Sequence, residues 1–98
     1  MTDSFQQILQ MGQQVQARLT QLQAELGQRT VSTSSGGGMV TVTADGRGKI
    51  RSVRIDPSVV DANDVEMLED LVLAAVSEAQ SRATAVYEEE MKKVSGGF

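Results

Sequence analysis

The sequence predicts an α+β fold with a long N-terminal helix, a three-stranded antiparallel sheet and a long C-terminal helical region. Apolar residues recur at helical spacing over residues 4–27 and 62–94 of the 98-residue chain. Between these segments, three short stretches rich in β-branched residues alternate apolar with polar side chains. A chain of this length suffices for one domain, so we expect residues 1–98 to form a single unit.

The first helix is expected over about residues 4–27. We expect Asp3 or Ser4 to cap its N-terminus and Gly27 to stand just past its C-terminus. Apolar residues step by three and four along it, as in the a/d positions of a heptad repeat. This pattern predicts packing against a partner helix, through Phe5, Ile8, Gly12, Val15, Leu19, Leu22 and Leu26.

Three strands are expected over about residues 29–35, 38–45 and 48–56. The segment Ser34–Gly38 separates the first strand from the second, and the dipeptide Asp45-Gly46 predicts the turn between the second and the third.

The third strand allows two arrangements. Strict alternation places Arg51, Val53 and Ile55 on one face. A bulge after Ile50 would instead bring Ile50, Val53 and Ile55 together. Because only the second arrangement gives a clean apolar face, the choice bears on how this strand meets the core.

The C-terminal helical region is expected over about residues 62–94. Asp61, Asn63 or Asp64 could cap it, and Asn63 with Glu66 has the spacing of a capping box. Its apolar stripe is large at the start and alanine-rich at the centre, which predicts close approach of a neighbouring element. The stripe consists of Val65, Leu68, Val72, Ala75, Ala79, Ala83 and Val86.

The expected element lengths predict an oligomer. At 1.5 Å per residue the two helices are roughly 35 and 45 Å long, whereas five-residue strands reach only about 17 Å. The helices must therefore overhang the sheet and leave apolar surface uncovered. A second copy of the chain is the most economical cover, as a symmetric dimer.

The composition argues against an enzyme. The chain has no Cys and no His, so we expect no thiolate metal site, no cofactor and no catalytic base of the commonest kind. Glu88, Glu89 and Glu90 are consecutive on a helix and point in different directions. The longest apolar run, Leu71–Val76, is far too short to span a membrane. The first residues lack the features of a secretory signal, so we expect an intracellular protein. Because the composition argues against an enzyme, we also expect no small-molecule substrate.

Charge is unevenly distributed along the chain. Residues 59–98 hold nine acidic side chains against three basic ones, whereas residues 31–58 hold four basic side chains against two acidic ones. The basic group could bind phosphates, or it could only solvate a small sheet and discourage edge-to-edge pairing. It consists of Arg47, Lys49, Arg51 and Arg54.

The motifs, in their order, resemble the YbaB/EbfC family of bacterial nucleoid-associated proteins. The resemblance runs from Ser35-Gly36-Gly37-Gly38 through Val40–Gly48 and Ile50–Val60, and continues in Glu66–Val72 and Ala74–Ala79. It implies a homodimer whose sheets join while the helices project like tweezers. It also implies binding of double-stranded DNA without catalysis, a cytoplasmic location at the nucleoid, and an influence on nucleoid organisation and gene expression.

Two functional hypotheses follow. A DNA-binding dimer would contact phosphates through basic side chains on helices and sheet, with Arg18, Arg29, Arg47, Lys49, Arg51, Arg54, Arg82, Lys92 and Lys93 as candidates. The alternative is a helical protein-interaction or holdase-like module without DNA binding, with Phe5, Ile8 and Val94 exposed at the helix tips. A relative that has lost DNA binding and serves another role as a dimer is a third, weaker hypothesis.

Overall fold

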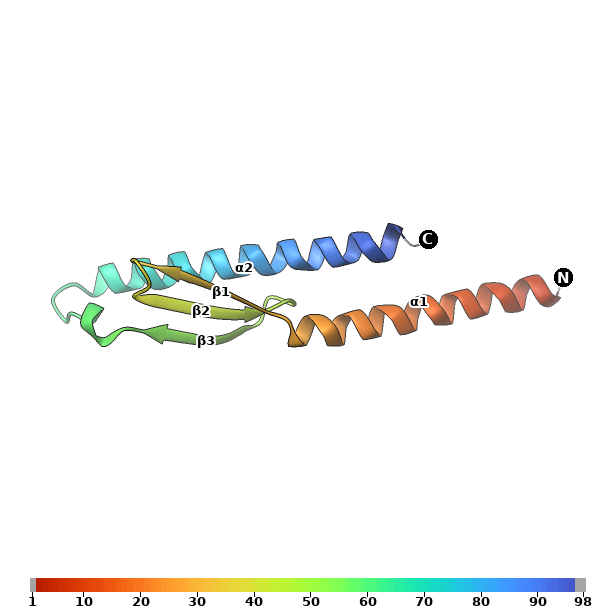
Figure 1. Cartoon of the computed structure of the whole chain (residues 1–98), viewed down its shortest axis with the longest axis horizontal. Coiled ribbons are helices and arrows are strands. Elements are labelled where there is room, and N and C mark those ends of the chain that lie inside the picture. Colours follow the sequence, from red (N-terminus) through yellow and green to blue (C-terminus); the bar gives the residue numbers. More distant parts are fainter. Residues whose placement is uncertain (1, 97–98) are drawn as a thin grey trace.

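The computed structural model describes residues 2–96 and confirms the α+β fold (Figure 1). Helix α1 leads into an antiparallel sheet of order β1-β2-β3, and a short 3-10 helix η1 connects the sheet to helix α2. The bounds are α1 Thr2–Gln28, β1 Thr30–Ser35, β2 Val40–Asp45, β3 Ile50–Ile55, η1 Pro57–Val59 and α2 Val65–Gly96.

The molecule is strongly elongated, as the helix lengths predicted. Its extents are 74 × 18 × 16 Å and its radius of gyration is 20.0 Å, against about 12.5 Å for a compact domain of this size. Both helices project beyond the same end of the sheet, and α1 continues well past the end of α2 (Figure 1). The accessible surface of 6993 Å² exceeds the roughly 5400 Å² of a compact monomer of 10.5 kDa.

Strand β3 takes the second of the two arrangements that its sequence allows, the one with a bulge. Ala44 pairs with Ile50 and Thr43 with Ser52, so Arg51 is the additional residue between them. The bulge places Ile50, Val53 and Ile55 opposite Ala44, Val42 and Val40, on the face that α2 covers. The opposite face of the sheet is polar, and the hydroxyls of Ser32 and Thr43 lie 3.0 Å apart on it.

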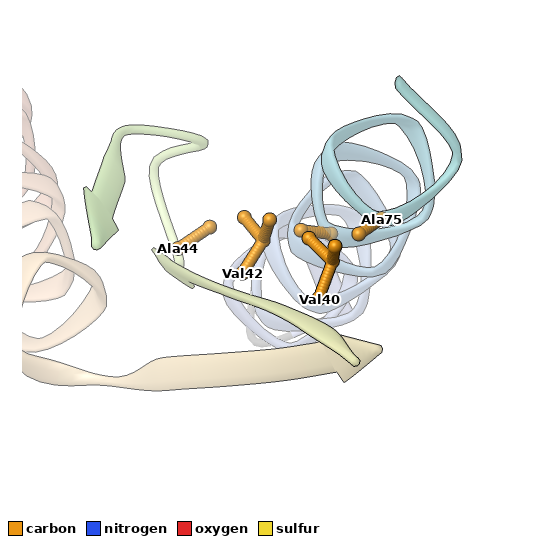
Figure 2. Close-up of a cluster of buried hydrophobic side chains, with 5 residues drawn as sticks. Val40, Val42, Ala44 and Ala75 are labelled. Carbon is orange, nitrogen blue, oxygen red and sulfur yellow. The ribbon is translucent and has the colours of Figure 1, made fainter. Parts of the chain in front are cut away.

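The main core joins α2 to the sheet through small residues. Ala75 and Ala79 are fully buried against Val40, Val42 and Ala44 (Figure 2), so the predicted close approach is confirmed. Short side chains let the helix lie close enough for β1 hydroxyls to reach its backbone. They donate to helix carbonyls, Thr33 Oγ1 to Ala75 O at 2.7 Å and Ser35 Oγ to Leu71 O at 2.6 Å.

Most element ends differ from expectation, by at most three residues, and the ends of the first two strands at Ser35 and Asp45 match it. Helix α1 includes Asp3 and Ser4, so neither is an N-cap outside it, and the strands are shorter than predicted. Asp64 caps α2, accepting from Met67 N at 3.2 Å, and the capping box predicted at Asn63 does not form. The reason is that the Asp61 carboxylate accepts a hydrogen bond from the Asn63 backbone N–H. In a capping box, the Glu66 side chain would accept from this N–H instead.

Helices α1 and α2 pack against each other within the chain, antiparallel, where α1 meets the sheet. Leu22, Leu26 and Val94 are buried there. Gly27 lies inside α1 without a positive φ, so it is not the C-terminal cap that was predicted. A Cβ at this position would lie 2.8 Å from Arg47 Nη2, so the Arg47 guanidinium would have to shift to admit one.

Within residues 2–96, neither helix has a stretch apolar enough to cross a membrane.

Candidate nucleic-acid interface

The β2–β3 turn that presents Arg47 and Lys49 is ordered by one buried carboxylate. The Asp45 side chain is fully buried, and its Oδ1 accepts from the backbone N–H of Arg47 at 2.9 Å and of Lys49 at 3.0 Å. Its Oδ2 accepts from the Arg51 guanidinium, from Nε at 3.0 Å and Nη2 at 2.8 Å. This network fixes the backbone that carries the two exposed cations.

These hydrogen bonds determine the ionisation of Asp45. Burial by itself raises the pKa of its carboxyl group, but the donors from Lys49, Arg47 and Arg51 outweigh burial and hold the pKa below its usual value of 3.8. Arg51 was a candidate for phosphate contact, and the structure gives it this internal partner. A charge reversal at Arg51 would set a second carboxylate against Asp45, so it would disturb the turn as well as any DNA contact.

Acid should therefore destabilise the protein through Asp45. A carboxyl group whose pKa is lower in the folded than in the unfolded state stabilises the fold at pH values above its unfolded-state pKa. This stabilisation is lost as the pH falls through the folded-state pKa. We expect the melting temperature to fall below about pH 4. At pH 7, Asp45→Asn should melt at least about 5 °C lower than the wild type and should show a smaller further loss in acid.

Thermal unfolding followed by circular dichroism between pH 7 and 2.5 measures this effect. Asp70→Asn, at an exposed position of α2, is the matched control and should follow the wild type. Equal acid sensitivity of Asp45→Asn and the wild type would contradict the assignment.

The same turn docks onto the end of α1. Gly46 N donates to the carbonyls of Leu26 and Arg29, both at 2.8 Å, and a Cβ at Gly46 would collide with Leu26. The Arg47 guanidinium lies over Gly27, and Arg51 Nη2 lies 3.4 Å from Gly27 O. Two glycines thus let the basic turn approach the helix closely.

A second ionic group joins the end of α1 to α2. Glu90 accepts from Arg29 Nη1 at 3.0 Å and from Lys93 Nζ at 3.1 Å. The hydrogen bond from Lys93 is the main reason why the pKa of Glu90 lies below its usual value, and Arg29 adds to the effect. Arg18 and Lys93 line one cavity of about 200 Å³ between the helices.

The structure thus gathers six of the nine predicted basic residues where α1, the β2–β3 turn and α2 meet. We call this group the junction cluster: Arg18, Arg29, Arg47, Lys49, Arg51 and Lys93. The carboxylates of Glu25, Asp45 and Glu90 lie among them. Glu88 and Glu89 adjoin Glu90 on α2, so six of the chain's nine cations gather beside five carboxylates, in a chain with net charge −4.

Three predicted basic residues lie outside the junction cluster. Arg54 pairs in register with Thr41 on the polar face of the sheet and lines a hollow near Pro57. Arg82 forms an ion pair with Glu78 at 2.8 Å. Lys92 is exposed near the end of α2, and within residues 2–96 no carboxylate lies within ion-pairing distance of it.

Asp45 and Glu90 are the organising residues that sequence reasoning missed. The Asp45-Gly46 dipeptide marked a turn, but its composition gave no sign that the carboxylate is buried. Glu90 lies in a run of three glutamates, and only the packing of α1 on α2 singles it out.

A group of five acidic residues lies at the opposite end of the molecule. They precede or open α2, at the end of the sheet where η1 leads into α2 (Figure 1). The group consists of Asp61, Asp64, Glu66, Glu69 and Asp70.

An apolar groove lies beside β3. Helix α2 packs mainly on β1 and β2, which leaves Val53 46% and Ile55 37% exposed on the core-facing side of the sheet. Leu73 on α2 is 65% exposed. The groove has a volume of about 470 Å³ and is lined by Ile55, Leu68, Glu69, Val72, Leu73 and Val76.

The predicted set of exposed helix-tip residues is wrong in one member. Phe5 and Ile8 are exposed, at 63% and 65%, but Val94 is buried against Leu22 and Leu26. The reason is that α2 ends alongside the middle of α1 rather than at its tip (Figure 1).

Proteins of similar sequence and structure support both the fold and the sequence resemblance. The chain is 50% identical over 82 residues to a nucleoid-associated protein of Moorella thermoacetica, covering 84% of this chain and 79% of the relative. It is 48% identical over 91 residues to a nucleoid-associated protein of Caldanaerobacter subterraneus, covering 93% and 82%.

A crystal structure of an uncharacterized protein from Helicobacter pylori shares the fold. Its TM-score is 0.76 at 24% identity, and the match covers 95% of this chain and 94% of that chain. The family model that matches this chain is that of the YbaB/EbfC DNA-binding family, and the match covers residues 1–98. The chain belongs to the YbaB/EbfC DNA-binding family.

Proposed function

We propose that this protein binds double-stranded DNA as a homodimer, without catalysis, and acts at the nucleoid in the bacterial cytoplasm. The observation that carries the proposal is the junction cluster, which gathers cations in a chain of net negative charge. Membership of a DNA-binding family and the names of its nucleoid-associated relatives support it.

The chemistry of the cluster favours the DNA backbone over the bases. Its members are arginines and lysines anchored at a junction between elements. Such side chains bind phosphates and position a duplex without reading its sequence. We therefore propose weak sequence preference and affinity dominated by electrostatics.

The proposed homodimer forms through the apolar groove. Its exposed aliphatic lining and the unpaired edge of β3 both lack cover within the chain. The excess surface over a compact monomer, about 1500 Å² per copy, is more than the roughly 800 Å² that a standard interface buries on each partner. Isologous contact of two grooves would cover both copies at once.

Binding of a labelled random-sequence 30-base-pair duplex, followed by fluorescence anisotropy, tests the function. We expect log affinity to fall linearly with log salt, with a slope of about −0.9 for each phosphate contacted. A duplex of different base composition should bind within a few-fold of the first. Absence of binding even at low salt would overturn the proposal.

The holdase-like alternative has one observation in its favour. Phe5, Ile8 and Met11 expose apolar surface on the projecting half of α1. Suppression of the aggregation of an unfolded client, in a protein that fails the DNA assay, would favour it.

A further inference from the structure

The projecting half of α1 carries an apolar stripe that nothing in the described chain covers. Phe5, Ile8, Leu9 and Met11 are between 50% and 65% exposed, and Val15 is half-buried. They lie beyond the end of α2, at the opposite end of the molecule from the apolar groove (Figure 1). Pairing of two grooves therefore leaves this stripe available.

The stripe continues a seam that already packs against a helix. Leu19, Leu22 and Leu26 follow it along the same heptad positions and pack antiparallel on Val86 and Val94 of α2. The exposed part, from Phe5 to the start of the packed seam at Leu19, extends the seam by about 20 Å of helix. Its geometry therefore suits another antiparallel helix.

Charge argues for a second copy as that helix. Residues 4–17 contain no charged side chain and are rich in glutamine. Two copies can approach each other there without like-charge repulsion, and DNA phosphates would find no cation.

The seam is complementary to itself. When two α1 helices run antiparallel about an axis at position 10, Phe5 lies opposite Val15 of the other copy and Ile8 opposite Gly12. Each large residue thus faces a smaller one, in the pairing of a with d positions. A Cβ at Gly12 would meet nothing within 4 Å, so there is space for an isoleucine from the other copy.

The remaining exposed apolar residues fit the same arrangement. Leu9 occupies an e position and Met11 a g position, one on each flank of the seam. In an antiparallel pair, e positions face e positions and g positions face g positions, so Leu9 would face Leu9 of the other copy and Met11 would face Met11. All four large apolar residues of this half of the helix would then lie in the contact.

We propose that the α1 tips of two copies pair as an antiparallel coiled coil over residues 2–18, a homotypic contact separate from the groove. It goes beyond the proposed DNA binding and depends on neither the DNA contact nor the groove dimer. Because the contact and the groove lie at opposite ends of a 74 Å molecule, one chain can use both.

Disulfide trapping tests the contact cleanly, since the chain has no cysteine. Met11→Cys should form a covalent dimer under mild oxidation, read on non-reducing gels. Gln10→Cys is the matched control, because position f points away from the seam. Paired thiols react at an effective concentration near millimolar, so we expect Met11→Cys to cross-link at least about tenfold faster than the control at micromolar protein.

Two second variants separate this contact from the other proposals. Adding Ile8→Gln to Met11→Cys removes an apolar layer and should reduce cross-linking to the control rate. Adding Leu73→Glu, which targets the groove, should leave cross-linking intact. Equal rates for Met11→Cys and Gln10→Cys, or cross-linking that survives Ile8→Gln unchanged, would overturn the tip contact whether or not the groove forms a dimer.

Discussion

Reversing both exposed charges of the β2–β3 turn, as Arg47→Glu with Lys49→Glu, should weaken DNA binding about 500- to 4000-fold at 0.1 M salt. In a dimer this variant removes four cations. Each phosphate contact contributes roughly a factor of eight for every tenfold change in salt, so four contacts account for a loss of this size. The slope of log affinity against log salt should also become shallower by about 3 to 4. Anisotropy titrations at several salt concentrations measure both quantities.

The chain offers a control with the same change of net charge. Arg54→Glu with Arg82→Glu reverses two cations outside the junction cluster. We expect this variant to bind less than about tenfold more weakly than the wild type, through the long-range field alone. A loss equal to that of the turn variant would show that net charge, and not the junction, governs binding.

The second large effect concerns the groove. In an Ile8→Gln background, which removes the tip contact, Leu73→Glu should convert the dimer to a monomer, halving the mass measured by light scattering to the 10.5 kDa of one chain. Leu73 is 65% exposed in the single chain, so the substitution should leave the fold intact. In the dimer it would bury an unpaired carboxylate against aliphatic side chains. DNA affinity should fall with the loss of the second binding surface.

Leu9→Glu provides the matched control for this prediction. It places the same charge at a half-exposed leucine of the other helix, far from the groove. At micromolar concentration the variant should keep the dimer mass. A dimer mass for Leu73→Glu in the Ile8→Gln background would place the interface outside the groove.

The sequence by itself determined the elements and several contacts between them. Heptad spacing located both helices, and glycine-rich turns separated three short strands. The alanines of α2 predicted its close approach to the sheet, confirmed by Ala75 and Ala79. These features are local: periodicity and side-chain size act over a few residues, so they can be read along the chain.

Only the tertiary structure decided which charges are used internally. Asp45 is buried and holds Arg51, while Glu90 links Arg29 to Lys93 across two helices. These partners stand up to 61 residues apart, and their pairing depends on how α1 docks on the turn and on α2. Sequence spacing cannot give such distances. The arrangement of three elements at one junction therefore separates anchored cations from free ones.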